Sequence, residues 1–215
     1  MLQLDHIVIA TPDMDESISQ YSSKFANKVV KGGEHEEWGT YNYLSFFSNT
    51  SYLEFINIYD FKTAKEAENP LIQHLVHVLE ESKYGAFQFA LRTKQLDKYI
   101  THFKKHNIPY KGPYAAERVK PDGTILKWRM LLPEYNYKDE VLPFLIEWED
   151  PNIVFSETNL SNAKSITKIK YGGITKEEFA RIYQLKPRKL DKNQLHLLNS
   201  KIFFDNDRKL RFDLA

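Results

Sequence analysis

The sequence contains no cysteine among its 215 residues. Disulfide bonds, zinc–thiolate centres, iron–sulfur clusters and catalytic thiols are therefore excluded. It also has no apolar run near the roughly 18 residues that a membrane-spanning helix requires. The opening stretch, MLQLDHIVIATPDMDE, has no basic region ahead of a long apolar segment. We therefore expect no signal peptide, and a cytoplasmic protein without a membrane partner.

An excess of charge of either sign is also missing. Lys and Arg total 30 and Asp and Glu total 29, which gives a formal net charge of +1. Proteins that bind nucleic acid usually carry a strong basic excess, so nucleic acid is not an expected partner. The sequence is instead rich in aromatic residues, with 14 Phe, 13 Tyr and 3 Trp. This content favours strands or an aromatic-lined cleft.

A pattern of one strand, one helix and then further strands occurs twice along the chain. Short apolar runs rich in β-branched residues indicate the strands, and apolar residues at helical spacing indicate the helices. The first copy has a strand at 4–11, a helix at 13–26, a short strand near 28–30 and strands at 38–47 and 51–58. The second has a strand at 86–93, a helix at 94–106 and strands at 125–132 and 142–148. We therefore expect two βαβββ modules, at residues 1–60 and 85–150, joined by a helical linker at residues 61–84.

The last segment, residues 151–215, has a different character. A polar, turn-rich stretch at 151–163 is typical of a linker. After it the sequence predicts a strand at 165–172, a helix at 176–184 and strands at 194–204 and 208–214. The turn Asp205-Asn206-Asp207 is expected to join the last two strands as a hairpin. This shortened third copy, a partial βαββ unit, would either cap a cleft or pair its open strands with a second chain to form a homodimer.

Several stretches carry a family resemblance. They are LDHIVIATPDMDESISQY, SYLEFINI, FALRTKQLDKYITHFKK and LPFLIEWED, to which GGEHEEWGTYN and RVKPDGTILKWRMLLP add more specific features. With two βαβββ units, residues 1–150 resemble the vicinal oxygen chelate superfamily of glyoxalases and extradiol dioxygenases, and within it the glyoxalase-like domain group. The resemblance implies an α+β fold in which paired βαβββ modules form a curved sheet around a cleft. Members bind a divalent metal ion in that cleft or have lost it.

The resemblance also implies where metal ligands would lie, on the first and last strands of each module. Aligning the threonines that end the two first strands places His6 opposite Gln88, and aligning YLEFI with LIEW places Glu54 opposite Glu147. The expected ligands are therefore His6, Glu54, Gln88 and Glu147. This mixed nitrogen and oxygen set suits one divalent ion, such as zinc, nickel, manganese or iron. In the metal-free alternative, these residues remain as the polar floor of the cleft.

Two of these ligands, both glutamates, are candidate catalytic groups. A carboxylate beside a metal ion can move a proton as a general acid–base, and Glu147 is the expected base, with Glu54 second. The structural alternative is that both glutamates form buried ion pairs with Arg92 or Lys127, because an unpaired buried carboxylate is costly.

Five further residues are candidates for binding a substrate: His35, Trp38, Asn42, Arg92 and Trp128. The first three come from the motif HEEWGTYN and offer acid–base, stacking and amide contacts, although Trp38 would alternatively only plug the mouth of the cleft. Arg92 would bind a carboxylate or phosphate of the ligand, or else form a structural ion pair. Trp128 is expected to form an apolar wall.

These residues support two hypotheses about function. In the first, the protein is an isomerase, lyase or dioxygenase that acts on a small oxygen-rich molecule with a divalent metal ion. In the second, it is a metal-free protein that sequesters a small molecule, as some members of the superfamily do with aromatic or antibiotic-like ligands. The enzyme requires His6, Glu54 and Glu147 to converge around a metal-sized gap, which the binding protein does not need.

Overall fold

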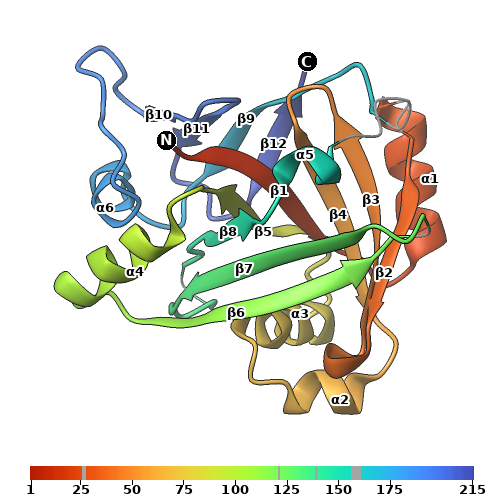
Figure 1. Ribbon diagram of the computed structural model, residues 1–215. Helices are drawn as coiled ribbons and strands as arrows, with labels where there is room; N and C mark the ends of the chain where they lie inside the picture. Colours follow the sequence, from red (N-terminus) through yellow and green to blue (C-terminus); the bar gives the residue numbers. More distant parts are fainter. Residues whose placement is uncertain (26–27, 121, 139, 156–160) are drawn as a thin grey trace.

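The computed structural model describes residues 1–25, 28–120, 122–138, 140–155 and 161–215. An eight-stranded sheet curls strongly around one of its faces, and a separate four-stranded sheet lies beside it (Figure 1). The α+β class and the paired βαβββ arrangement expected from the sequence are confirmed. Within the described ranges, no helix is long and apolar enough to cross a membrane.

The first module and the linker make up the first third of the chain. Their elements are β1 (Gln3–Ala10), α1 (Met14–Phe25), β2 (Val30–His35), the 3-10 helix η1 (Glu36–Trp38), β3 (Thr40–Phe47), β4 (Ser51–Ile58), α2 (Phe61–Glu66) and α3 (Pro70–Glu80). Helix α3 begins where Asn69 accepts a hydrogen bond from the Leu71 N–H, and Pro70 fills the first turn, where an N–H is not needed. Residue 26, expected at the end of the first helix, lies outside the described residues.

The second module repeats this order. Its elements are β5 (Gly85–Arg92), α4 (Leu96–Lys105), β6 (Tyr110–Val119), β7 (Ile125–Pro133) and β8 (Phe144–Trp148). Strand β6 has the sequence YKGPYAAERV, which gives little strand signal because it contains glycine and proline. It forms nonetheless because it is an edge strand with a register shift around Pro113, the kind of place where a sheet tolerates proline.

The two modules join through their first strands. The strand order is β2-β3-β4-β1-β5-β8-β7-β6, and β1 pairs with β5 in antiparallel fashion at the centre. In each module the first strand also pairs in parallel with the last strand. His6 lies beside Tyr52 in the first module, and Ala90 lies beside Phe144 in the second. The first and last strands of each module therefore lie side by side at the centre of the sheet.

Strand alternation gives the large sheet two different faces. Tyr52 and Glu54 of β4 line a cavity on what we call the inner face, whereas Leu53 and Phe55 of the same strand belong to an apolar core on the outer face. Helix α3 lies across one end of the inner face, where its buried side chains pack against β1 and β4.

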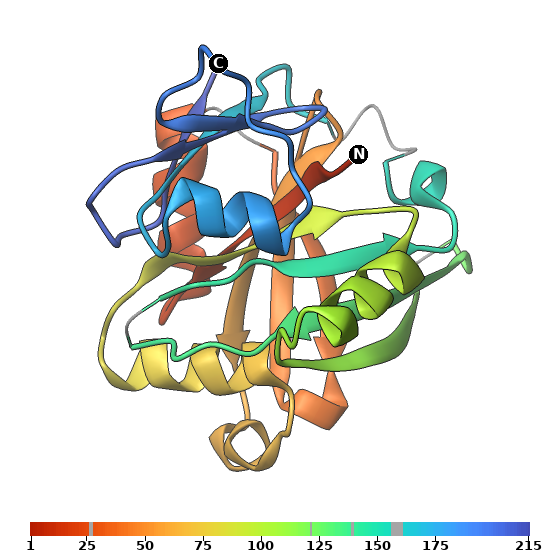
Figure 2. The same ribbon diagram turned by 90° about the vertical axis from the view of Figure 1, so that its left-hand side faces the viewer.

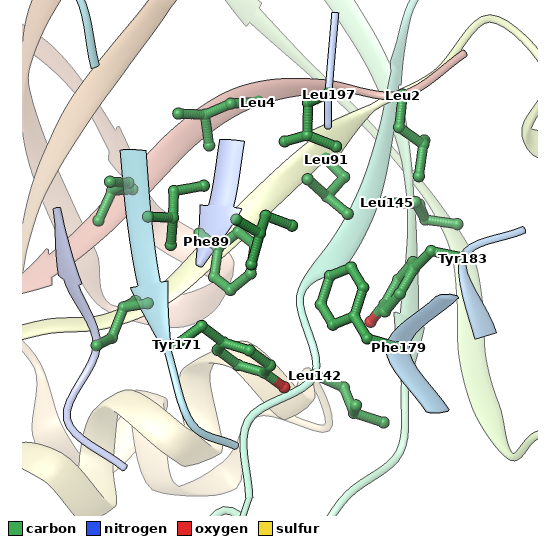
Figure 3. Packing of buried hydrophobic residues seen from close by; sticks show 14 of the residues in the cluster. Leu2, Leu4, Phe89, Leu91, Leu142, Leu145, Tyr171, Phe179, Tyr183 and Leu197 are labelled. Atoms are coloured by element: carbon green, nitrogen blue, oxygen red, sulfur yellow. The ribbon is translucent and has the colours of Figure 1, made fainter. Parts of the chain in front are cut away.

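The C-terminal unit, residues 161–215, packs against the outer face of the large sheet (Figure 2). It follows the short helix α5 (Pro151–Val154), and its elements are β9 (Ile166–Tyr171), α6 (Lys176–Ile182), β10 (Gln194–His196), β11 (Lys201–Phe204) and β12 (Arg211–Leu214). Tyr171, Phe179 and Tyr183 of this unit pack near Phe89 and Leu91 of β5 (Figure 3). Its sheet therefore lies on the side away from the cavity.

The strand order of this unit differs from the sequence prediction. The order is β10-β11-β9-β12, so the turn Asp205-Asn206-Asp207 does not join a hairpin. Strand β9 lies between the last two strands, parallel to β11 and antiparallel to β12. The hairpin instead joins β10 to β11, within a stretch that the sequence predicts as one strand. Residues 156–160 of the predicted linker lie outside the described ranges, and a homodimer formed through open strands stays a prediction.

Candidate functional site

A cavity of about 740 Å³ lies within the curled sheet, between the two modules. Strands β1 to β4 form one side, β6 to β8 form the other, and Leu71 and Ile72 of α3 close one end. Its walls combine aliphatic and aromatic side chains and include all three tryptophans of the chain, Trp38, Trp128 and Trp148. The volume is in the range of typical small-molecule sites.

A bulge in β1 places two polar side chains together at the floor of this cavity. The register with β5 passes from Leu4 to His6 and leaves Asp5 as an extra residue. Such a bulge re-aims side chains that would otherwise point to opposite faces. Asp5 is completely buried, and its Oδ1 accepts a hydrogen bond from His6 Nδ1 at 2.7 Å.

His6 connects Asp5 to a second carboxylate. Its Nε2 lies 3.3 Å from Glu54 Oε2. Glu54 Oε1 accepts a hydrogen bond from Asn42 Nδ2, and Asn42 Oδ1 accepts one from the Gly33 N–H at 2.8 Å. These contacts make one continuous polar chain, which we call the floor chain: Asp5, His6, Glu54 and Asn42.

Two further residues contact Asp5, namely Trp148 of the cavity wall and Arg92 behind it. Asp5 Oδ2 accepts a hydrogen bond from Trp148 Nε1 at 3.0 Å, and Arg92 Nη1 lies 3.5 Å from the same oxygen. Arg92 is in turn fixed by hydrogen bonds to Gln3 and Thr50. Arg92 is not one of the residues that line the cavity, so its place is behind the floor chain rather than against a ligand.

Asn199 of the C-terminal unit supports the bulge from the other side. Its Oδ1 accepts a hydrogen bond from the Leu4 N–H at 2.8 Å, and its Nδ2 donates to the Leu4 carbonyl at 2.9 Å. The amide thus satisfies both backbone groups of the residue before Asp5, as a neighbouring strand would. The C-terminal unit therefore helps to hold the floor chain in place.

The charges of the floor chain follow from these contacts. Burial alone would lower the pKa of His6, but hydrogen bonds to Asp5 and Glu54 raise it to about 9. Burial alone would raise the pKa of Glu54, but its contacts with His6 and Asn42 lower it. At neutral pH the floor therefore holds an imidazolium between two carboxylates.

His35 lines the same cavity in the opposite charge state. Burial lowers the pKa of His35, the Glu54 carboxylate opposes that effect, and the positive charge of Arg118 adds to it. Its Nδ1 lies 3.0 Å from Thr40 Oγ1, and its ring centroid lies 5.5 Å from that of Trp38. A neutral imidazole offers one hydrogen-bond donor and one acceptor, so His35 can exchange a proton with a bound molecule.

The structure brings some of the predicted site residues together and separates others. Those that line the cavity are His6, His35, Trp38, Asn42, Glu54 and Trp128. Gln88 is buried elsewhere, where its Oε1 accepts a hydrogen bond from the Phe89 N–H at 2.8 Å. Its Nε2 donates to the Leu142 carbonyl at 3.1 Å and to the Tyr135 hydroxyl. The hydrogen-bonding capacity of the Gln88 amide is therefore used inside the protein.

Glu147 lies on the outer face of β8. It accepts a hydrogen bond from the Leu96 N–H at the start of α4 at 3.1 Å, and its other oxygen pairs with the Arg129 guanidinium. Its neighbours in the strand, Ile146 and Trp148, face the cavity. Glu147 is therefore an ion-paired residue on the far side of the sheet from Glu54.

Strand alternation explains this separation. In β4 the cavity-lining positions include Tyr52 and Glu54, and in β8 they are Phe144, Ile146 and Trp148. Glu147 lies one residue away from a position that faces the cavity. A one-residue shift along a strand moves a side chain to the other face, which is why aligning Glu54 with Glu147 misplaces the second glutamate.

The residues at the floor do not fit a divalent metal ion. Both ring nitrogens of His6 are engaged, Nδ1 by Asp5 at 2.7 Å and Nε2 by Glu54 at 3.3 Å, so in this arrangement neither is turned toward a metal position. Gln88 and Glu147 are engaged elsewhere. In the described part of the chain, no group of three or more His, Cys, Asp or Glu side chains is arranged to hold a metal ion.

Sequence reasoning missed several residues of the site: Asp5, Tyr52, Arg118 and Trp148. Simple alternation places Asp5 and His6 on opposite faces of the sheet, and no sequence pattern predicts the bulge that brings their side chains together. Tyr52 stacks on the His6 ring with centroids 4.5 Å apart, and its position two residues before Glu54 is a signal that alternation could have used. Arg118 lines the cavity although the sequence suggests only a solvated charge.

Comparison with known proteins agrees with this architecture. A family model described as Glyoxalase-like domain matches residues 4–186. A hypothetical protein from Staphylococcus aureus is similar with a TM-score of 0.75 and 19% identity, over 95% of this chain and 87% of that chain. A methylmalonyl-CoA epimerase from Streptomyces coelicolor, in complex with 2-nitronate-propionyl-CoA, is similar with a TM-score of 0.50 and 18% identity, over 69% of this chain and 98% of that chain. The search of curated proteins gave no match. At these identities the structural likeness concerns the fold alone.

Proposed function

This chain belongs to the glyoxalase-like domain family, and we propose that it binds a small organic molecule in the cavity between its two modules, without a metal ion on the floor chain. The observation that carries the proposal is the cavity itself, about 740 Å³, with aliphatic and aromatic walls and one polar floor. An apolar space with a few convergent polar groups is the usual form of a small-molecule site. Zinc, nickel, manganese or iron is left out because both ring nitrogens of His6 contact carboxylates, and because Gln88 and Glu147 of the expected ligand set lie away from the cavity.

The floor chain limits what the ligand can present. The Glu54 carboxylate keeps lone pairs beyond those that His6 and Asn42 use, so it can accept a hydrogen bond from a hydroxyl or amino group. His35 adds one donor or acceptor beside it. The aliphatic and aromatic walls favour a flat or apolar body. A small oxygen-bearing molecule with a polar end at the floor therefore fits the site.

Metal content and ligand binding test this proposal together. Protein purified without chelator is expected to contain substoichiometric metal, before and after soaking with zinc, nickel, manganese or iron(II). Because every tryptophan lines the cavity, a bound molecule is expected to change the intrinsic fluorescence, and EDTA is expected to leave that titration unchanged. Glu147→Gln is the matched control. One equivalent of metal in the wild type that is lost in His6→Gln and kept in Glu147→Gln would overturn the metal-free proposal.

A second candidate function, proton transfer on the bound molecule, has one observation in its favour. Two histidines in one cavity have pKa values displaced in opposite directions, with that of His35 lowered and that of His6 raised. Such a pair is typical of a base and an acid that serve one reaction, as in a lyase or isomerase. His35 and Glu54 are the groups that would accept the proton.

Exchange of carbon-bound protons with deuterated solvent tests this second function. A panel of small carbonyl compounds is incubated with the protein and followed by NMR. His35→Gln is expected to abolish the exchange of a compound that reacts, and Glu147→Gln to leave it unchanged. Equal exchange in His35→Gln and the wild type would contradict the role of His35.

A further inference from the structure

Arg118 lies where the two edges of the curled sheet come together. Arg118 belongs to β6, the edge strand of the second module, and Gly33 belongs to β2, the edge strand of the first. A methyl group at Gly33 would stand 2.9 Å from Arg118 Cδ, so the arginine side chain lies across the bare backbone of the glycine. The side chain of Arg118 also lines the cavity. The arginine of one module thus reaches the edge of the other.

Four charged residues line the mouth, by which we mean the solvent-exposed end of the cavity: Lys31, Arg118, Lys120 and Asp122. Lys31 pairs with Glu34 at 3.0 Å, and Asp122 accepts a hydrogen bond from the Thr124 N–H at 2.9 Å. Within the described part of the chain, the Arg118 guanidinium makes no hydrogen bond or ion pair. It is a half-buried cation whose donors remain available.

The charge of Arg118 acts on the interior of the cavity. Burial is the main cause that lowers the pKa of His35, and Arg118 lowers it further. Burial is also the main cause that raises the pKa of Tyr52, and Arg118 opposes that rise. These two side chains come from β2 and β4, so the guanidinium of β6 acts across the cavity on the opposite module.

We propose that Arg118 binds an anionic group of the ligand, a carboxylate or a phosphate, and that the ligand is therefore an organic anion with an apolar body. The proposal rests on the proposed function, namely that the cavity holds a small molecule. A guanidinium offers a planar fork of donors that matches both anions. At the floor the Glu54 carboxylate lines the cavity, so an anionic group placed beside it would be repelled. The ligand is thus oriented with its anionic group at the mouth and a hydrogen-bond donor toward Glu54.

A pair of probes that differ in one charge tests this orientation. The first is 8-anilinonaphthalene-1-sulfonate, an aromatic anion, and the second is N-phenyl-1-naphthylamine, the same skeleton without the sulfonate. Binding is followed at neutral pH by energy transfer from the tryptophans, all of which line the cavity. Arg118→Ala is expected to weaken binding of the anion about tenfold and to leave the neutral probe within about twofold. Arg118→Lys is expected to recover part of the loss, because it keeps the charge without the fork.

Arg129→Ala is the matched control. Arg129 lies on the neighbouring strand β7 but on the outer face, where it lines a second, shallower hollow and pairs with Glu147. Its removal is expected to change the affinity of neither probe. Competition of the anionic probe by 1-naphthoate and by 1-naphthyl phosphate then distinguishes a carboxylate from a phosphate ligand.

The outcomes separate the inference from the proposed function. If neither probe binds the wild type, the small-molecule cavity itself is refuted. If both bind and Arg118→Ala changes neither affinity, the cavity stands and the role of Arg118 is refuted. If Arg129→Ala, rather than Arg118→Ala, abolishes binding of the anionic probe, the anion binds in the outer hollow and the role of Arg118 is refuted. Unchanged melting temperatures of all variants are required for these comparisons.

Discussion

The strongest prediction concerns the buried imidazolium of the floor chain. The pKa of His6 is raised in the folded protein from 6.5 to about 9, because its hydrogen bonds to Asp5 and Glu54 outweigh the effect of burial. In the unfolded chain the side chain returns to its ordinary value. The folded state therefore binds the proton more tightly, and this contribution to stability is fully present below pH 6.5 and is lost as the pH rises toward 9.

The magnitude follows from the size of the shift. One pKa unit corresponds to about 1.4 kcal/mol, so a change from 6.5 to about 9 corresponds to about 3 kcal/mol. A His6→Gln variant cannot take up this proton. Its free energy of unfolding is lower than that of the wild type at pH 6.5. Between pH 6.5 and pH 9, however, only the wild type loses the stability that the His6 proton contributes. The wild type should thus lose about 3 kcal/mol more than the variant over this interval.

Urea unfolding at several pH values between 6.5 and 9 measures this difference. His106→Gln, at an exposed position after α4, is the control and is expected to follow the wild type. Titration of the His6 ring by NMR gives the same pKa independently. Equal pH dependence of unfolding in the wild type and His6→Gln, or a midpoint of the His6 signal near 6.5, would refute the ion-paired floor chain.

Three further predictions concern other parts of the fold. Burial lowers the pKa of His74 to about 3, so the folded protein holds this side chain neutral and loses stability as the pH falls below 6.5. In urea unfolding, the wild type should lose about 3 kcal/mol more than His74→Phe between pH 6.5 and pH 4. Asn199→Ala leaves the two Leu4 backbone groups unpaired and should cost about 1–3 kcal/mol by the same measurement; a change below the experimental error would contradict the clamp on the bulge. Phe179→Ala removes a fully buried ring from the core between the two sheets and should cost about 3–5 kcal/mol, and a much smaller cost would mean that the C-terminal unit is loosely attached.

The fold of the first two modules was predictable because the strands and helices indicated by the local sequence patterns are the ones that form, and they occur in the predicted order. Alternating apolar strands and amphipathic helices recur in the same order, so the paired βαβββ arrangement follows from the sequence. The same reasoning failed for Asp205-Asn206-Asp207, where a good turn sequence stands between two strands that do not pair. A turn signal is local, whereas the placement of β9 between β11 and β12 depends on packing against the rest of the protein.

The site was predictable only in its first half. His6 and Glu54 do meet at the floor of the cavity, and the motif around His35 and Trp38 lines the same space. The second half fails because alignment of Glu54 with Glu147 is off by one residue, which reverses the face. The bulge at Asp5 is a feature of strand pairing rather than of either strand alone, so no pattern within one strand reveals it.

The position of the C-terminal unit decides how this chain can be divided. A fragment that ends near residue 150 would retain both modules, although it would lose Val154 and Phe155 from the cavity lining. It would, however, expose Phe89, Leu91 and Leu145 to water, because these side chains now pack against the C-terminal unit. Large exposed apolar patches promote aggregation, so such a fragment is expected to be insoluble whatever the state of its site. The C-terminal unit therefore shields the apolar outer face of the large sheet from water, and the two modules should be studied only with this unit attached.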